Sequence, residues 1–285
     1  MRISAYVLAG DPTWVERSVG AYYEVVERLV VSYDVDDRGW TGAQLSASAV
    51  VERLRSLDVD HKMIFLPGSF HDNSVAPLHN DTAQRAAALS VAGEGMDWVL
   101  QLDTDEVLPD MPRLLDVLAR VDDDVLGVEW PMSVLFRGLR GGAYLQVCSA
   151  GGAAHVEYPG SVAVRPTAKL VQARRHVGVF ERVLVAGDTS SLQVVRASEA
   201  VERRSFSIPG EAAILHNSWG RSPAVVWRKV RSWGHNEGLR SLAFYFLVWL
   251  PSPLTSRILR NFHPLNRTLW PRLRRLPAES VGVHP

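Results

Sequence analysis

An apolar strand that ends abruptly in acids is the feature that most constrains this chain. The run reads Trp98-Val99-Leu100-Gln101-Leu102-Asp103-Thr104-Asp105-Glu106. Because side chains alternate along a strand, Asp103 and Asp105 can face a common point if the extended geometry persists. Mg²⁺ and Mn²⁺ prefer carboxylate oxygens and can bridge to the phosphates of a nucleotide, so the pair is a candidate diphosphate clamp. The alternative interpretation is a solvated acidic turn that caps the next helix.

The residues before Trp130 predict alternating strands and helices. Strands are expected at residues 2–9, 29–33, 62–66 and 98–102. Thr13 and Glu16 fit a capping box for the first helix, Asn80 or Asp81 is expected to cap the third, and residues 110–112 begin the fourth. Such alternation is typical of a doubly wound, mainly parallel sheet, whose ligands gather outside the carboxyl ends of its strands.

The pattern changes after Trp130 to short strands with many glycines, which predicts an antiparallel or mixed addition to the sheet. Ser222 and Pro223 then have the residue types of a helix cap and a first helical position. The apolar run at residues 243–250 is too short to cross a bilayer, which needs about 20 residues. We expect it either to lie in a membrane interface or to dock onto the core.

Composition and the N-terminal residues indicate the compartment in which the protein is expected. Hydrophobic residues make up 47% of the chain and charged residues 22%, as in ordinary globular proteins. Cys148 is the only cysteine, which excludes an intramolecular disulfide and a cysteine-based zinc site and suits a reducing compartment. The N-terminal apolar stretch is brief and runs into Asp11 and Pro12, so it predicts a core strand and a cytoplasmic protein.

A formal net charge of zero hides an asymmetry. Residues 221–275 contain eleven Lys or Arg residues and one acid, Glu237, a net charge of +10 against −10 for the rest. Such a segment could meet anionic lipid at the inner face of a membrane, or an acidic substrate, or simply fold onto the acidic body. Nucleic acid is not an expected partner, because no binding motif is recognisable.

Together these pieces resemble a family 2-type glycosyltransferase of the GT-A fold, of the bacterial cytoplasmic type. The resemblance runs from Arg2 to Glu237, and residues 97–106 are similar to the metal-binding signature of the family. It implies an α/β fold with a GT-A-type doubly wound, mostly parallel central sheet, helices on both faces, a mixed-strand addition and a C-terminal helical segment. Residues 1–220 would be the catalytic domain, and residues 221–285 a basic helical extension.

The resemblance also implies a reaction. A sugar would move, with inversion, from a nucleotide-diphosphate sugar to a hydroxyl of a carbohydrate, lipid-linked or small-molecule acceptor. Asp103 and Asp105 would hold Mn²⁺ or Mg²⁺ and the donor diphosphate, with His216 as a further metal or phosphate ligand. Asp34 would contact the nucleotide base or ribose. The other candidate substrate-binding residues are Asn80, Asp81 and Arg85 on the helix before the acidic strand, Lys169 and Lys229 for phosphate, and Trp219 for stacking on a sugar.

The catalytic base is the remaining role. Inverting transfer needs a carboxylate within hydrogen-bond reach of the acceptor hydroxyl. Glu181, in a segment similar to one that completes the active site in the family, is the first candidate, and Glu211 is the second. Either carboxylate could instead be an ion-pair partner of Arg182 or Arg221.

Three other functions stay open. A phosphatase of the haloacid dehalogenase type would use Asp103 and Asp105 as nucleophile and proton donor, although that pair usually follows the first strand. A nucleotidyltransferase would want a Gly-rich phosphate loop near the first strand, which this chain lacks. A non-catalytic carbohydrate- or lipid-binding module would keep the fold without the reaction.

Overall fold

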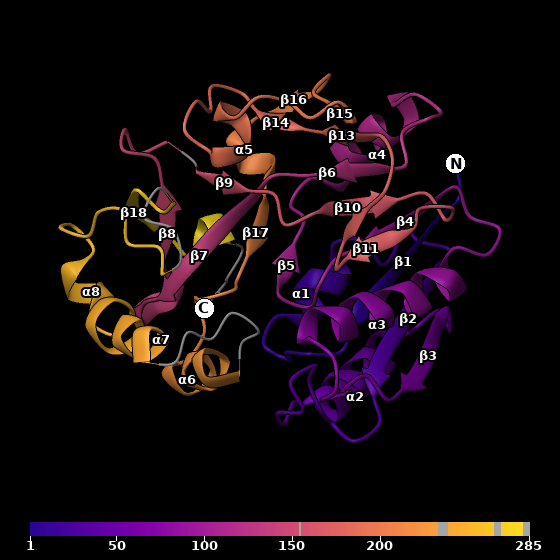
Figure 1. The fold of residues 1–285 in the computed structure, drawn as a ribbon, viewed down its shortest axis with the longest axis horizontal. Helices are drawn as coiled ribbons and strands as arrows, with labels where there is room; N and C mark the ends of the chain where they lie inside the picture. Colours follow the sequence, from indigo (N-terminus) through magenta and orange to yellow (C-terminus); the bar gives the residue numbers. More distant parts are fainter. Residues whose placement is uncertain (154, 233–238, 265–268, 282–285) are drawn as a thin grey trace. The chain divides into compact units, whose positions relative to one another are not determined.

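A computed structural model describes residues 1–153, 155–232, 239–264 and 269–281 (Figure 1). Trp233 and Glu237 therefore lie outside the described residues. The chain forms two compact units. Unit 1 comprises Met1–Trp130, Tyr158–Val183 and Ser198–Ser207, and unit 2 comprises Pro131–Glu157, Leu184–Ala197 and Ile208–Pro285.

Unit 1 alternates strands and helices in its first 130 residues. Its elements are β1 (Ile3–Leu8), α1 (Val15–Gly20), β2 (Arg28–Asp34), α2 (Ala47–Leu57), β3 (Met63–Gly68), α3 (Pro77–Ala92), β4 (Trp98–Gln101), β5 (Glu106–Val107), α4 (Met111–Arg120), β6 (Gly127–Glu129), β10 (Ser161–Val164), β11 (Leu170–Gln172), β12 (Arg175–His176), β13 (Phe180–Arg182) and β15 (Glu202–Arg203).

The central sheet of unit 1 has eight strands in the order β15-β13-β6-β10-β4-β1-β2-β3. The pairs among β4, β1, β2 and β3 are all parallel, and β10 runs antiparallel to both β4 and β6. Strands β1 and β4 are fully buried and apolar along almost their whole length, as expected for parallel strands covered on both faces. This confirms the predicted α/β class with a mostly parallel central sheet.

Helices cover both faces of this sheet. Alternate residues of β1, Tyr6 and Leu8, pack against Ala88, Leu89 and Ala92 of α3. The right-handed crossover rule puts α1 and α2 on the opposite face, because the chain moves one way from β1 to β3 and then returns through α3 to β4.

Unit 2 contains the mixed strands and the C-terminal helices. Its elements are β7 (Met132–Gly138), η1 (Arg140–Gly142), β8 (Tyr144–Cys148), β9 (Val156–Glu157), β14 (Leu184–Val185), α5 (Leu192–Val195), η2 (Gly210–Ala212), β17 (Ile214–His216), α6 (Pro223–Ser232), α7 (Leu239–Phe244), η3 (a π-helical turn, Tyr245–Trp249), α8 (Ser252–Thr255), β18 (Arg272–Leu276) and η4 (Glu279–Val281); β16 (Ser207–Ile208) begins in unit 1.

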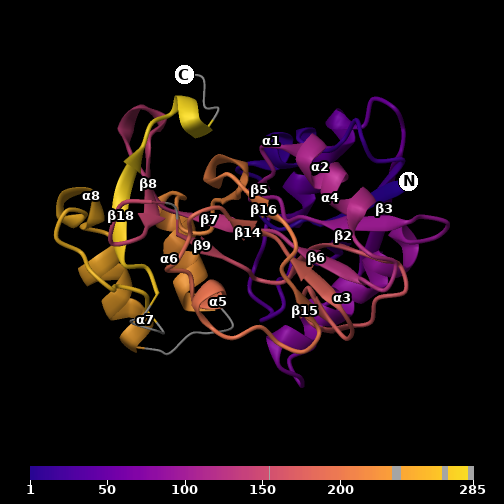
Figure 2. The ribbon, with the colours of Figure 1, turned by 90° about the horizontal axis from the view of Figure 1, so that it is seen from above.

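Strand β7 is central to unit 2. It pairs with β17 in parallel and with β8 and β9 antiparallel, and β18 adds to the free side of β8 (Figure 2). An aromatic core joins this sheet to the helices: the ring of Phe136 on β7 lies 5.0–6.3 Å from those of Phe244, Phe262 and Trp270 in edge-on contacts. The expected mixed-strand addition and C-terminal helical segment are therefore both present.

Two helix starts differ from the prediction. Helix α1 begins at Val15 without a side-chain cap, and the backbone N–H of Thr13 donates to Asp11 instead, so no capping box forms. Helix α3 begins at Pro77, whose fixed φ suits the first helical position, so Asn80 and Asp81 lie inside the helix and cap nothing.

The segment after residue 220 packs with earlier strands in unit 2. The functional boundary expected between residues 220 and 221 stays a prediction. Among the described residues, the structure contains no helix with the length and apolar character needed to cross a bilayer.

Candidate functional site

The carboxyl ends of β1, β2, β3 and β4 form one edge of the sheet in unit 1. Strand β1 lies between β2 and β4, so the chain passes to one side of β1 after that strand and to the other side after β3. Ligands of open α/β sheets bind in the crevice that such a reversal creates. Asp34, the last residue of β2, and Asp103, two residues after β4, both lie at this edge.

Asp103 is the centre of a group of ionised side chains. Its Oδ2 accepts hydrogen bonds from Nη2 of Arg85 at 3.0 Å and from Nη2 of Arg174 at 2.6 Å. Nε of Arg85 donates to Asp81 at 2.6 Å, and Nη2 of Arg174 also donates to Glu106 at 2.7 Å. We call Asp81, Arg85, Asp103, Glu106 and Arg174 the Asp103 cluster.

Helix α3 supplies two members of the cluster because its buried face changes character along its length. Asn80, Asp81, Gln84 and Arg85 are buried in its first half, whereas Ala88, Leu89 and Ala92 are buried in its second half. The apolar half packs on the sheet, and the polar half lies toward the edge where Asp103 is. The sequence therefore contained a signal for this site, namely polar residues at the helical positions that face the core.

Arg174 lies in the turn between β11 and β12, and contacts with Gln101 and Gly160 hold its backbone in place. Nε2 of Gln101, the last residue of β4, donates to the carbonyl oxygens of Ser161 and Arg174. Gly160 has φ +138°, and a Cβ built there would lie 2.8 Å from the Cβ of Arg174. Only glycine allows this conformation and this close approach.

The acidic run itself forms a turn after β4. The N–H of Glu106 donates to the carbonyl of Asp103, and the Glu106 carboxylate accepts the N–H of Asp103 at 3.0 Å. The extended geometry expected at Asp103 and Asp105 therefore does not persist. Sequence reasoning missed Glu106, which is 1% exposed and closes this turn while pairing with Arg174.

Four buried polar atoms around Asp103 have no hydrogen-bond partner among the described residues. They are Oδ1 of Asp103, Nη1 of Arg85, Nη1 of Arg174 and the hydroxyl of Tyr22. Buried polar atoms in native proteins are almost always paired, so each of these requires an explanation. One unpaired acceptor beside two unpaired cationic donors suits a ligand that carries both a cation and an anion.

The charges of Asp103 and of its two arginine partners are stable at neutral pH. Burial by itself would raise the pKa of Asp103, but Arg174 and Arg85 outweigh it and hold that pKa at about 2. The neighbouring carboxylates likewise raise the pKa values of Arg85 and Arg174 above the ordinary value, against the opposite effect of burial. Burial raises the pKa of Tyr22, and Asp103 adds to this, so the phenol stays neutral.

Asp34 uses its carboxylate to organise two loops. Oδ1 accepts the N–H groups of Asp36 and Arg38, and Oδ2 accepts the N–H of Phe70 and lies 2.8 Å from Nδ1 of His71. Burial would raise the pKa of Asp34, but these hydrogen bonds lower it further than burial raises it. A carboxylate has about four acceptor positions, so all of them are occupied here.

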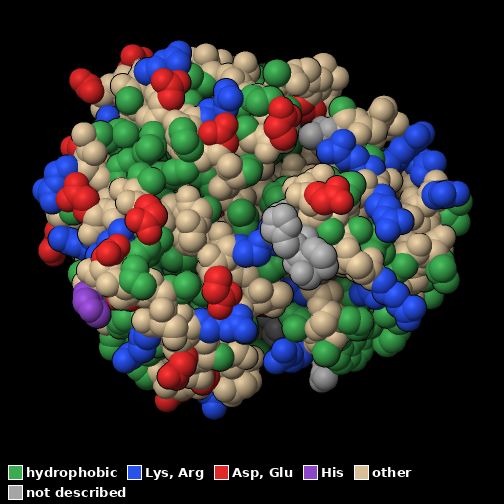
Figure 3. Space-filling view, turned by 180° about the vertical axis from the view of Figure 1, so that it is seen from behind, with side chains coloured by type: hydrophobic (Ala, Val, Ile, Leu, Met, Phe, Trp, Pro, Cys, Tyr) green, Lys and Arg blue, Asp and Glu red, His purple; other side chains and the backbone are tan. Residues whose placement is uncertain are grey.

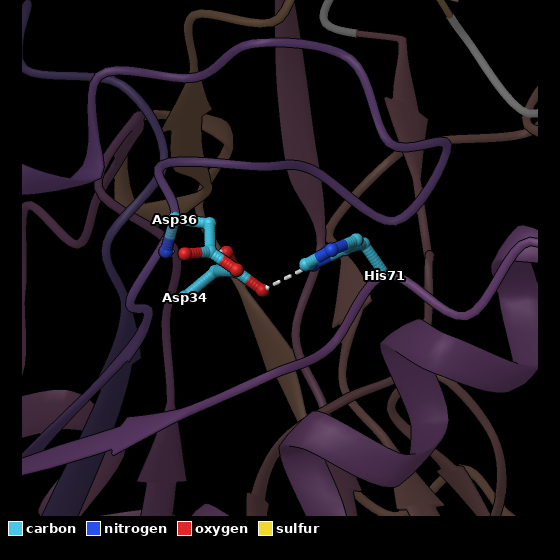
Figure 4. A group of neighbouring side chains, drawn as sticks. All are labelled: Asp34, Asp36 and His71. Carbon is cyan, nitrogen blue, oxygen red and sulfur yellow. Dashed lines mark hydrogen bonds and ion pairs between the residues drawn. The ribbon is translucent and has the colours of Figure 1, made fainter.

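Asp34, Asp36 and His71 also form a group that could hold a metal ion, since one ligand atom from each lies within 4.8 Å of the others. Figure 4 shows the three side chains and the contact between Asp34 and His71. A cation bound there would displace hydrogen bonds of Asp34 that are already made. The atoms around Asp103 need no such displacement.

Two further features lie near the end of β2. Nδ2 of Asn80 donates to the carbonyls of Trp40 and Asp72, so Asn80 ties two loops to α3. A cavity of about 270 Å³ opens between the end of β2 and α2. Its lining residues are Tyr33, Asp34, Val35, Asp37, Ser48, Val51, Glu52 and Arg55.

Two other candidates in unit 1 lie apart from the cluster in the chain. Lys169 is exposed immediately before β11. Glu181 is 1% exposed on β13, and its Oε1 accepts the N–H groups of Ser205 and Phe206. Strands β6 and β10 lie between β13 and β4, a separation of roughly 14 Å at the usual strand spacing. Arg182 pairs with Glu129 and Glu202.

The remaining candidates belong to unit 2. Glu211 is exposed on η2, and His216 ends β17. Nζ of Lys229 donates to the carbonyl oxygen and the hydroxyl of Ser218. Trp219 is 4% exposed in the aromatic core, with its ring 5.4 Å from that of Phe244. The substrate and catalytic roles expected for these residues stay predictions.

Sequence reasoning gave no role to Glu157, which is also in unit 2. Burial raises the pKa of Glu157, against the opposite effect of a hydrogen bond from Nε1 of Trp270 and of the charges of His216 and Lys229. The structure therefore brings a carboxyl group near two of the residues that the sequence singled out.

Comparison of the sequence with family models finds no match, and comparison with curated proteins finds none either. Solved structures with a similar arrangement include 4-diphosphocytidyl-2C-methyl-D-erythritol synthase from Anaerococcus prevotii DSM 20548, with TM-score 0.35 and 10% identity over 58% of this chain and 70% of that one. Residues 1–349 of S. aureus TarS match with TM-score 0.29 and 18% identity over 50% of this chain and 37% of that one. Likeness at this level says nothing about the activity of this chain.

Proposed function

We propose that this chain is a glycosyltransferase that takes a sugar from a nucleotide-diphosphate sugar and binds the diphosphate, with a divalent cation, at the Asp103 cluster. The observation that carries the proposal is the set of four unpartnered buried atoms around Asp103, two of them on arginines. They lie at the edge of the sheet where open α/β folds bind nucleotides. The likeness of residues 97–106 to the metal-binding signature of family 2 glycosyltransferases supports the same assignment.

The residues present fit Mn²⁺ or Mg²⁺. Oδ1 of Asp103 is an ionised oxygen without a partner, and Asp105 supplies a second carboxylate two residues later. Bound there, the cation would neutralise charge that develops on the departing nucleoside diphosphate. The chain itself would contribute Arg85 and Arg174, because each guanidinium has an Nη1 group able to donate to a phosphate oxygen.

Other parts of unit 1 would position the nucleoside. Asp34 orders the loops after β2 and β3, and Asn80 joins the loops at Trp40 and Asp72. We propose that these loops, rather than new bonds to the Asp34 carboxylate, hold the base and ribose. Lys169, His216, Lys229 and Trp219 stay proposed contacts to phosphate, metal or sugar.

Glu181 is the proposed base, which would take the proton of the acceptor hydroxyl in an inverting transfer, and Glu211 is the second candidate. We expect Glu181→Gln to keep donor affinity and lose transfer. An active Glu181→Gln variant together with an inactive Glu211→Gln variant would give the role to Glu211.

Titration calorimetry with UDP, GDP and dTDP, in Mn²⁺ and in EDTA, tests the site. We expect Mn²⁺-dependent binding of at least one nucleotide, which Asp103→Asn and Asp105→Asn abolish while circular dichroism shows folded proteins. Asp116→Asn, on the exposed face of α4, is the matched control and should bind normally. Equal binding by all variants would contradict the assignment.

The reaction is tested with a panel of nucleotide-sugars and Mn²⁺. Slow, Mn²⁺-dependent release of nucleoside diphosphate supports the transferase. Release of phosphate from simple monoesters would instead identify a phosphatase of the haloacid dehalogenase type, and sugar binding without turnover would identify a binding module.

A further inference from the structure

Among the described residues after α7 in unit 2, five large apolar side chains are exposed, in addition to Leu239 at the start of α7. Their exposed fractions are 52% for Phe246, 74% for Leu247, 39% for Leu250, 91% for Leu254 and 75% for Ile258. Phe246, Leu250, Leu254 and Ile258 follow one another at intervals of four, the spacing that keeps side chains near one side wherever the backbone is helical. We call these five residues the apolar stripe. Monomeric proteins rarely expose large apolar side chains in such a continuous row.

The opposite side of the same segment is fixed in the core. Phe244, Tyr245 and Trp249 are buried, and Nε1 of Trp249 donates to the carbonyls of Phe136 and Trp219. The rings of Tyr245 and Trp249 stack at 5.3 Å. The segment therefore cannot turn to bury the apolar stripe without losing these contacts, so the stripe stays outward in the folded unit.

The charge of the segment that carries the stripe has a single sign. Residues 239–276 contain seven arginines and no Asp or Glu. Arg240, Arg257 and Arg260 are exposed on the helical segment, and Arg272 and Arg275 are exposed on β18. Figure 3 shows Lys and Arg side chains gathered beside apolar side chains along one flank of that view.

We propose that the apolar stripe and its arginines bind the surface of a membrane that contains anionic lipid, with the helices lying in the interface. Exposed Leu, Ile and Phe side chains would enter the boundary between headgroups and acyl chains, while arginine side chains reach up to lipid phosphates. The helices after residue 239 are too short to cross, and the π-helical turn and Pro251 interrupt them.

A second copy of the chain fits this surface poorly. In a two-fold dimer the same patch would face itself, which would bring arginines against arginines with no acid in the segment to pair with them. Anionic lipid satisfies both the apolar and the cationic parts at once. This inference does not depend on the proposed enzymatic function.

Flotation with vesicles tests the proposal on the full chain. We expect binding to vesicles of phosphatidylcholine with phosphatidylglycerol, little binding to phosphatidylcholine alone, and weaker binding at high salt. Leu254→Ser with Ile258→Ser, and separately Arg257→Gln with Arg260→Gln, should each reduce the bound fraction at least about tenfold.

Matched controls replace residues of the same type elsewhere. Val59→Ser, at a side chain that is 71% exposed in unit 1, and Arg140→Gln should leave flotation unchanged. Binding that is equal in the stripe variants and the controls would overturn the proposal. The proposal would also be overturned if the wild-type protein did not bind anionic vesicles and formed a dimer in size-exclusion chromatography. In that case, Leu254→Ser with Ile258→Ser should dissociate the dimer.

Discussion

Replacing Arg174 with Met would remove the ion pair between its guanidinium and the buried carboxylate of Glu106. Glu106 is 1% exposed, and the side chain of Arg174 is 4% exposed. Removing one partner of a buried ion pair destabilises a protein by about 3–5 kcal/mol, because the other charge stays desolvated. In a chain of this size, each kcal/mol lowers the melting temperature by roughly 2–4 °C. We therefore expect Arg174→Met to melt roughly 6–20 °C below the wild type.

Urea unfolding and thermal scans by circular dichroism measure this effect. Arg120→Met removes an ion pair in which both side chains are more than half exposed, and it should change the free energy of unfolding by less than about 1 kcal/mol. Adding Glu106→Gln to Arg174→Met removes the charge that Arg174 paired with and keeps an acceptor for the N–H of Asp103. The double variant should therefore be more stable than Arg174→Met alone. A loss below about 1 kcal/mol in Arg174→Met, or no recovery in the double variant, would refute the reasoning.

Three further changes test other parts of the structure. Gly160→Ala forces a Cβ to 2.8 Å from the Cβ of Arg174 at φ +138°. We therefore expect it to lower the free energy of unfolding by about 1–3 kcal/mol and to weaken the proposed nucleotide binding. Wild-type values in urea unfolding and in calorimetry would contradict this. Burial lowers the pKa of His155, so the unfolded chain binds a proton at a higher pH than the folded chain does, and stability falls as pH drops below about 6.5. In urea titrations between about pH 7 and 5, His155→Gln should reduce this pH dependence of stability, and an unchanged slope would count against the argument. The hydrogen bonds that lower the pKa of Asp34 stabilise the fold above about pH 4, and this stabilisation is lost as the pH falls below that value. Asp34→Asn should remove this pH dependence and speed amide exchange at Phe70. Unaltered exchange would argue against the loop contacts.

Local signals in the sequence predicted some elements well. The side chain of Asp110 accepts the N–H of Arg113 at the start of α4, and Pro223 begins α6 after Ser222, both as expected from their residue types. The signal at Thr13 and Glu16 was equally clear but wrong. Asp11 offers a competing acceptor for the N–H of Thr13, and α1 extends only from Val15 to Gly20. A capping motif indicates which bonds are available, whereas neighbouring residues decide which bonds form.

The candidate site was predictable only in part. The acidic run after an apolar strand located the edge of the sheet, because that inference needs only local pattern. Arg174 comes 71 residues after Asp103 and reaches it through the turn between β11 and β12, so no pattern near either residue connects them. Glu106 belongs to the acidic run, but its ion pair with Arg174 could not be predicted, because Arg174 lies in a distant part of the chain.

That distance has a consequence during synthesis. The ribosome completes β1 to β4, with the carboxylates of Asp103 and Glu106, well before it adds the guanidinium that joins them. A nascent chain or an expressed fragment that stops at Trp130 lacks the contacts of Arg174 with Asp103 and Glu106, so we expect it to be less stable than the full chain. A fragment made to test the proposed nucleotide site should therefore extend through the turn between β11 and β12, which carries Arg174.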